Sequence, residues 1–170
     1  GYALAGWYYY AVHCRTPEKA LEFFERDEKM GRLHPNGMLL LAGLYALVND
    51  RQQATQIVQN AYCKDDNIFG GYVIVGFCDY ANKRDLRYLR SMIEKDKQRN
   101  IDAQHLNYLY GAVLRKDGEI QQSKLLINHV AQRSALAANY AKSWLIRIGC
   151  ADKQLISELI TSEFKQLRQI

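Results

Sequence analysis

The sequence predicts an all-α protein, an α-solenoid of about five antiparallel helix pairs. Three observations predict this fold. A degenerate nine-residue pattern recurs along the chain, and its copies begin 32 to 35 residues apart. Each copy follows a more hydrophobic stretch and a short polar break. The 170-residue chain also has only two prolines, Pro17 and Pro35, which favours many helices because proline breaks helix interiors.

The nine-residue pattern predicts the second helix of each pair. Its copies begin at Pro17, Arg51, Leu86, Ile120 and Asp152. The fourth place of each copy holds a small or apolar residue, and the eighth place holds an apolar residue. Positions four apart share one face of a helix, so each copy has a face suited to a core. We expect second helices near 17–31, 51–63, 85–98, 119–132 and 152–168.

The hydrophobic stretches predict the first helix of each pair. We expect these helices near 2–14, 36–49, 69–81, 103–115 and 136–148. The third stretch contains YVIVGFCDY (72–80), whose β-branched and aromatic residues would also suit a strand. Its place in the repeat favours a helix, and the strand stays open as an alternative. Polar breaks such as Asn49-Asp50 would end one helix and cap the next.

A single repeat domain is expected over 1–170, because one helix pair cannot bury its apolar face alone and stacked neighbours share a core. Its units would cover about 2–33, 36–67, 69–101, 102–134 and 135–170.

The period and these positions resemble the tetratricopeptide repeat family and its relative, the Sel1-like repeat. Units of that kind span about 34 residues. Their second helix carries Ala and, four residues on, a large apolar residue, as do Ala20 and Phe24 here; Gly6 with Tyr9 fits the Sel1-like first helix. No copy has the whole signature, and no functional residue of the family falls on a matched position. The resemblance implies a superhelix that binds a polypeptide.

No catalytic or metal-binding motif is present in the sequence. The four cysteines and four histidines have neither CxxC nor HExxH nor zinc-finger spacing. The glycines form no GxxxxGK[ST] or GxGxxG loop that would cradle phosphates. We therefore expect no enzymatic activity, no metal and no cofactor.

Ten of the twelve tyrosines fall on the predicted first helices. The resemblance implies that first helices line a concave groove, where aromatic side chains would anchor a partner segment. About half of these tyrosines are expected in the core instead, because a helix buries only one stripe of its surface and leaves the rest accessible. Our candidates for the groove are Tyr9, Tyr45, Tyr80 and Tyr108.

A basic cluster extends from Lys83 to Arg99. Within it, Arg84, Arg87 and Arg90 are three residues apart and would share a helix face. This basic patch would bind an acidic partner or phosphates. The plainer alternative is a solvated outer face, since charged runs commonly cover helices.

The leading interpretation is a scaffold or adaptor that holds a protein or peptide partner. The basic charge of the chain is compatible with an acidic partner. A helical-repeat RNA-binding protein ranks second, because the net charge is +5 and the pI is about 9.0. Basic and aromatic residues do not recur at fixed positions in each unit, which counts against RNA. A chaperone for secreted proteins is a third alternative.

Cysteine usage and hydropathy bear on location. The four cysteines have no CxxC spacing, which favours a reduced, cytoplasmic protein. The alternative of an exported protein whose signal peptide has been removed stays open. No run of about 18 apolar residues is present, so no transmembrane segment is expected.

Overall fold

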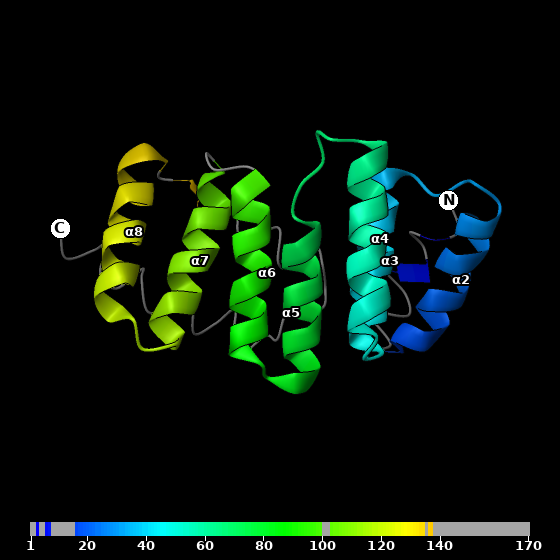
Figure 1. Cartoon of the computed structure of the whole chain (residues 1–170), viewed down its shortest axis with the longest axis horizontal. Coiled ribbons are helices and arrows are strands. Elements are labelled where there is room, and N and C mark those ends of the chain that lie inside the picture. Colours follow the sequence, from blue (N-terminus) through cyan, green and yellow to red (C-terminus); the bar gives the residue numbers. More distant parts are fainter. Residues whose placement is uncertain (1–2, 4–5, 8–15, 100–102, 135, 138–170) are drawn as a thin grey trace.

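The computed structural model describes residues 3, 6–7, 16–99, 103–134 and 136–137 (Figure 1). These residues form helices joined by short turns, and none of them is in a strand. The helices are α2 (Pro17–Lys29), α3 (Pro35–Leu47), α4 (Arg51–Lys64), α5 (Gly71–Lys83), α6 (Leu86–Arg99), α7 (Gln104–Lys116) and α8 (Ile120–Arg133).

The all-α prediction is confirmed for this part of the chain. Each of these seven helices begins and ends within two residues of its predicted range. The segment 72–80 lies inside α5, so the strand alternative is wrong. The predicted helices 2–14, 136–148 and 152–168 lie almost wholly outside the described residues.

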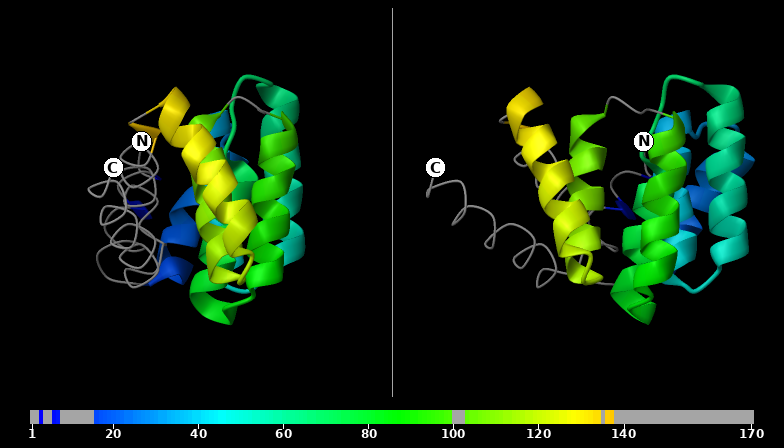
Figure 2. Two further views of the ribbon diagram at one scale, coloured as in Figure 1. Left: turned by 90° about the vertical axis from the view of Figure 1, so that its left-hand side faces the viewer. Right: turned by 60° about the vertical axis from the view of Figure 1, so that its left-hand side comes forward.

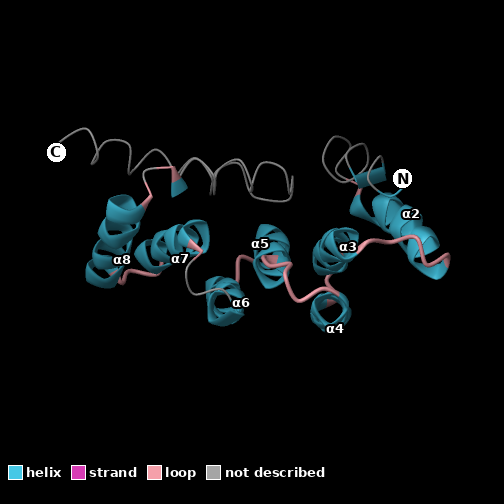
Figure 3. Ribbon diagram, turned by 90° about the horizontal axis from the view of Figure 1, so that it is seen from above, coloured by secondary structure: helices cyan, strands magenta, loops and turns pink. Residues whose placement is uncertain are grey.

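The helices follow one another across the molecule in chain order, from α2 at one end to α8 at the other (Figure 3). Seen from above, α3 and α5 lie in one row, and α4 and α6 lie in a second row beneath it. Extensive packing joins α3 to α4, α5 to α6 and α7 to α8, and α3 also packs on α5. In the side views of Figure 2, the helices stand roughly upright beside one another, with α8 tilted.

The recurring small and apolar positions form the core. In α2, α4 and α6 both positions of the pattern are almost fully buried: Ala20, Phe24, Ala54, Val58, Leu89 and Ile93. Close packing within a pair requires glycine on the first helix. A Cβ on Gly76 would lie 2.9 Å from the Cβ of Met92, and a Cβ on Gly111 would lie 2.8 Å from the Cγ1 of Ile127.

The turn between the two helices of a pair has a repeated form. The residue two places before the second helix has a positive φ in three pairs: Asn49 at 69°, Arg84 at 55° and Gly118 at 90°. This left-handed conformation ends the first helix. The acidic residue that follows caps the next helix in two pairs, because Asp50 accepts from Gln53 N at 3.0 Å and Asp85 from Tyr88 N at 3.1 Å.

Candidate functional site

The predicted groove tyrosines lie in unlike environments. Tyr80 and Tyr108 are each 5% exposed and belong to the hydrophobic core. Tyr45 is half-buried and donates its hydroxyl to Glu25 Oε1 at 2.6 Å. Burial and the nearby Glu25 raise the pKa of Tyr45, so the phenol stays protonated and donates. Tyr9 lies outside the described residues.

A partner therefore has direct access to only one of these three described tyrosines. Contact with Tyr80 or Tyr108 would require their side chains to become exposed. The assignment of Tyr9 and Tyr45 to a groove stays a prediction.

The three arginines of the predicted basic patch also differ from one another. Arg84 is exposed at the end of α5, and Arg87 is exposed in the first turn of α6. Arg90 is half-buried and forms ion pairs with Asp117, at 3.1 Å, and with Glu119. Its charge is therefore neutralised within the chain, whereas the side chain of Arg87 is exposed.

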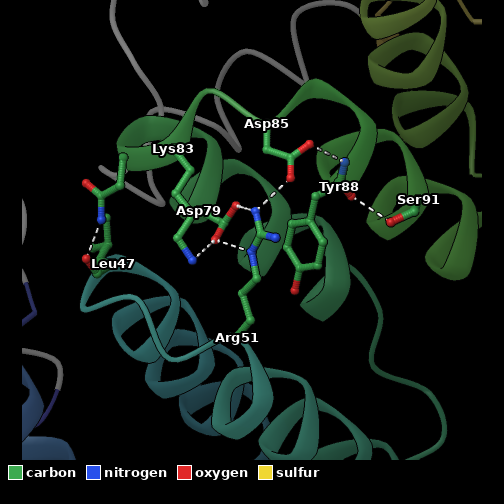
Figure 4. A network of polar contacts seen from close by, with 8 residues as sticks. Leu47, Arg51, Asp79, Lys83, Asp85, Tyr88 and Ser91 are labelled. Atoms are coloured by element: carbon green, nitrogen blue, oxygen red, sulfur yellow. Dashed lines mark hydrogen bonds and ion pairs between the residues drawn. The ribbon is translucent and has the colours of Figure 1, made fainter.

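The most elaborate polar contact joins α4 to the third helix pair (Figure 4). Arg51 contacts both oxygens of Asp79, with Nε at 2.7 Å and Nη2 at 2.6 Å, and its Nη2 also lies 3.0 Å from Asp85. The guanidinium carbon is 3.9 Å from the ring centre of Tyr88. Lys83 Nζ adds a contact of 3.5 Å to Asp79. We call these five residues the Arg51 network.

Burial of the Asp79 carboxylate explains why it has several cationic partners in this network. Asp79 is fully buried, and a buried carboxylate without a partner is strongly unfavourable. The planar guanidinium satisfies both of its oxygens, which a lysine could not do alone. The pKa of Asp85 is held below its usual range, mainly by the hydrogen bond from Tyr88 N and secondly by the hydrogen bond from Arg51. The network therefore fixes α4 against the ends of α5 and α6.

A second network connects α6 to the fourth pair. Arg90 contacts Asp117 and Glu119 in the turn before α8, and its Nε lies 3.4 Å from the hydroxyl of Tyr110. Tyr110 in turn donates to Glu94. We call these five residues the Arg90 network.

The two networks share one principle. An arginine on one second helix binds the acidic residue just before the next second helix, Asp85 for Arg51 and Glu119 for Arg90. These contacts were not predicted from the sequence, although an acidic residue directly before a second helix was a visible signal.

Two buried aspartates occupy the same repeat position, the eleventh residue of α2 and of α6. Asp27 accepts from Ala3 N at 3.1 Å, and Asp96 accepts from Val73 N at 2.8 Å. Asp96 thus satisfies an N–H in the first turn of α5, and Asp27 satisfies that of Ala3. Neither aspartate was predicted from the sequence, although a carboxylate on an otherwise apolar stripe was a usable signal.

Asp96 has a further partner. Tyr62 donates its hydroxyl to Asp96 and accepts from Gly71 N at 2.8 Å. Burial raises the pKa of Asp96 above its usual range, while the hydrogen bonds from Tyr62 and Val73 oppose that rise. These contacts hold the first turn of α5 against the ends of α4 and α6.

No group of three or more His, Cys, Asp or Glu residues in the described part of the chain could hold a metal ion. Cys63 is exposed and Cys78 is buried. A hollow of about 180 Å³ is lined by Asp66, Asn67, Ile68, Phe69 and Arg99. It is small beside typical ligand pockets, which begin at about 300 Å³.

Comparison with known proteins found no matching family model, curated protein or solved structure. The resemblance to tetratricopeptide and Sel1-like repeats therefore rests on the sequence pattern. Among the helices described, none has both the length and the apolar character needed to cross a membrane.

Proposed function

We propose that the chain is a non-catalytic scaffold or adaptor that holds a partner polypeptide. In this proposal it is a cytoplasmic, tetratricopeptide-like solenoid of about five helix pairs. The observation that carries the proposal is the row of successive helix pairs at the repeat spacing, with ionic networks between neighbouring pairs. Stacked units of this kind present an extended surface, on which many such proteins bind their partners.

The networks support a preformed binding surface. Arg51 fixes the second pair to the third, and Arg90 fixes the third to the fourth. Fixed neighbours keep the curvature of the row constant, so a partner loses less conformational entropy when it binds. This favours a holding function over a flexible linker.

The same contacts count against RNA as the partner. Arg51 and Arg90 bind carboxylates, and Arg99 binds Asp66 at 2.9 Å. A cation that is paired within the chain contributes little to binding of phosphates, which depends on neutralising backbone charge. RNA stays an outcome of the test.

The test is affinity capture from the native source, with and without ribonuclease, at about 0.15 M and 0.5 M salt. We expect a polypeptide that survives both treatments, and that gives saturable binding to this chain after both are purified. Hydrogen exchange on the complex should then show protection on the first helices α3, α5 and α7. Capture that ribonuclease or the higher salt abolishes would contradict the scaffold function and favour RNA.

Tyr45→Phe is a useful variant in the same experiment. It removes the hydroxyl that binds Glu25 and keeps the half-buried ring. If the ring anchors the partner in the groove, Tyr45→Phe should bind normally and Tyr45→Ala should bind about tenfold more weakly. Equal binding by all three proteins would remove Tyr45 from the groove.

A further inference from the structure

The helices α5 and α7 are buried around their whole circumference. Every residue from Gly71 to Tyr80 in α5 is buried, and so is every residue from Leu106 to Leu114 in α7. A helix that is buried on all sides needs neighbours on all sides. Within the described part of the chain, the main neighbours of α5 are α3, α4 and α6, and those of α7 are α6 and α8. These neighbours leave one face of each helix to account for.

The contacts of α5 locate that face. Ile74 faces α3, because a Cβ on Gly43 would lie 2.7 Å from Ile74 Cγ2. Gly76 faces α6, and Asp79 faces α4 through its ion pair. Figure 3 shows α4 and α6 in the row beneath α5. Phe77 comes two residues before Asp79, so helical geometry places it almost opposite, away from α4. Nevertheless Phe77 is only 1% exposed.

The contacts of α7 locate a similar face. Gly111 packs on α8, and Tyr110 contacts α6 through its hydroxyl. Leu109 and Ala112 are three residues apart and lie on the side that faces neither α6 nor α8. Both are almost fully buried. Phe77, Leu109 and Ala112 therefore belong to an apolar face on the first helices, here called the first-helix face.

The residues that follow α8 approach this face. Ala137 is almost fully buried, and it lines a small hollow together with His105 in the first turn of α7. His105 is four residues before Leu109 and so lies on the same side of α7. The described N-terminal residues lie at the other end of the row, against α2. The segment 138–170 therefore starts beside the first-helix face.

The sequence of this segment suits such a face. Residues 152–168 have the pattern of an amphipathic helix, because apolar residues recur three or four apart, at Leu155, Ile156, Leu159, Ile160, Phe164 and Leu167. The opposite positions are polar, among them Thr161 and Lys165. As a helix these residues would be roughly 25 Å long, which is enough to cross two helices that lie about 10 Å apart.

We propose that residues 152–168 dock on the first-helix face and occupy the surface that a partner polypeptide uses. Their apolar stripe would keep Phe77, Leu109 and Ala112 from water. This inference rests on the proposed scaffold function and adds its regulation, because a partner has to displace the segment. The fifth pair would then fold back over the third pair instead of only extending the row. The apparent affinity for a partner falls in proportion to the fraction of molecules whose face is open.

Photochemical crosslinking of the full chain tests where the segment lies. The photoreactive residue p-benzoylphenylalanine in place of Phe77 should crosslink to residues 152–168 within one molecule, as mass spectrometry would show. The matched control carries the same residue in place of Gln56, which is exposed on α4, and should not crosslink to the segment. Crosslinks from position 77 that miss the segment would overturn the proposal. A crosslinked dimer would overturn it too, by assigning the face to a second copy.

Binding of a peptide tests the displacement. The probe is a fluorescent synthetic peptide of residues 152–168, added to the full chain. Ile160→Glu places a charge on the apolar stripe and should open the face, so we expect it to bind the peptide at least about tenfold more tightly than the wild type does. Thr161→Glu adds the same charge on the polar side and should bind within about twofold of the wild type. Equal binding by the three proteins would overturn the proposal.

The scaffold function is judged separately, by capture of the natural polypeptide. If the wild type and Ile160→Glu capture that polypeptide equally, the scaffold stands and the docked segment is wrong. If the peptide binds as expected but neither protein captures a polypeptide, the docked segment stands and the scaffold function is wrong.

Discussion

At the scale of single residues, the buried Asp96 should be important for stability. Asp96→Ala would leave the Tyr62 hydroxyl and the Val73 N–H without their acceptor. We expect a loss of about 2–4 kcal/mol in the free energy of unfolding, measured by urea denaturation. Asp96→Asn keeps an acceptor oxygen and should lose less. Asp66→Asn, at an exposed carboxylate, is the control and should leave the urea midpoint unchanged.

The raised pKa of Asp96 also predicts a dependence of stability on pH. The folded state holds this proton more tightly than the unfolded chain does. The contribution of Asp96 to stability therefore falls as pH rises from about 4, the usual pKa of Asp, through the raised pKa. Wild type and Asp96→Asn should diverge over this range, with the wild type losing more stability as pH increases. Parallel curves in urea denaturation at each pH would contradict the prediction.

The sequence did not separate core tyrosines from surface ones. Tyr45 and Tyr80 are both on first helices, yet one is half-buried and the other lies in the core. Their placement depends on which neighbouring helix covers each ring, and repeat spacing does not reveal that.

At the scale of helices, the bounds could be predicted because local signals agree. Small and apolar residues four apart mark each second helix, and Asp50 caps α4 as its position suggests. The networks between helices could not be predicted in the same way. Asp79 lies inside a hydrophobic stretch, and its partner Arg51 is 28 residues away on another helix. Only the packing of α4 against the third pair brings them together.

The Arg51 network predicts a specific pattern of mutant stabilities. Arg51→Met leaves Asp79 buried with Lys83 as its remaining cation, so we expect a loss of about 2–4 kcal/mol. The double variant Arg51→Met, Asp79→Leu removes both charges and should recover much of that loss. Urea denaturation of the two single variants and the double variant measures the coupling. Additive losses would mean that the pair contributes little to holding α4 in place.

At the scale of the whole molecule, the interface between the third and fourth helix pairs differs from the interface between the second and third. The second and third pairs share the packing of α3 on α5, in addition to the Arg51 network. The third and fourth pairs meet mainly through α6 and α7, where the Arg90 network lies. An interface that relies on polar contacts is weakened more by loss of one charge than an apolar interface is. The junction between α6 and α7 should therefore be the first to open.

Arg90→Gln tests this order of opening by native-state hydrogen exchange. The variant leaves Asp117 and Glu119 without their arginine and weakens the contact to Tyr110. We expect amide exchange in α7 and α8 to accelerate by about tenfold, a loss of roughly 1.4 kcal/mol in local stability, while α3 and α4 are unchanged. Arg87→Gln, an exposed neighbour on the same helix, is the control. Uniform acceleration across all helices would show that the row opens as one cooperative unit, and the junction would then have no special weakness.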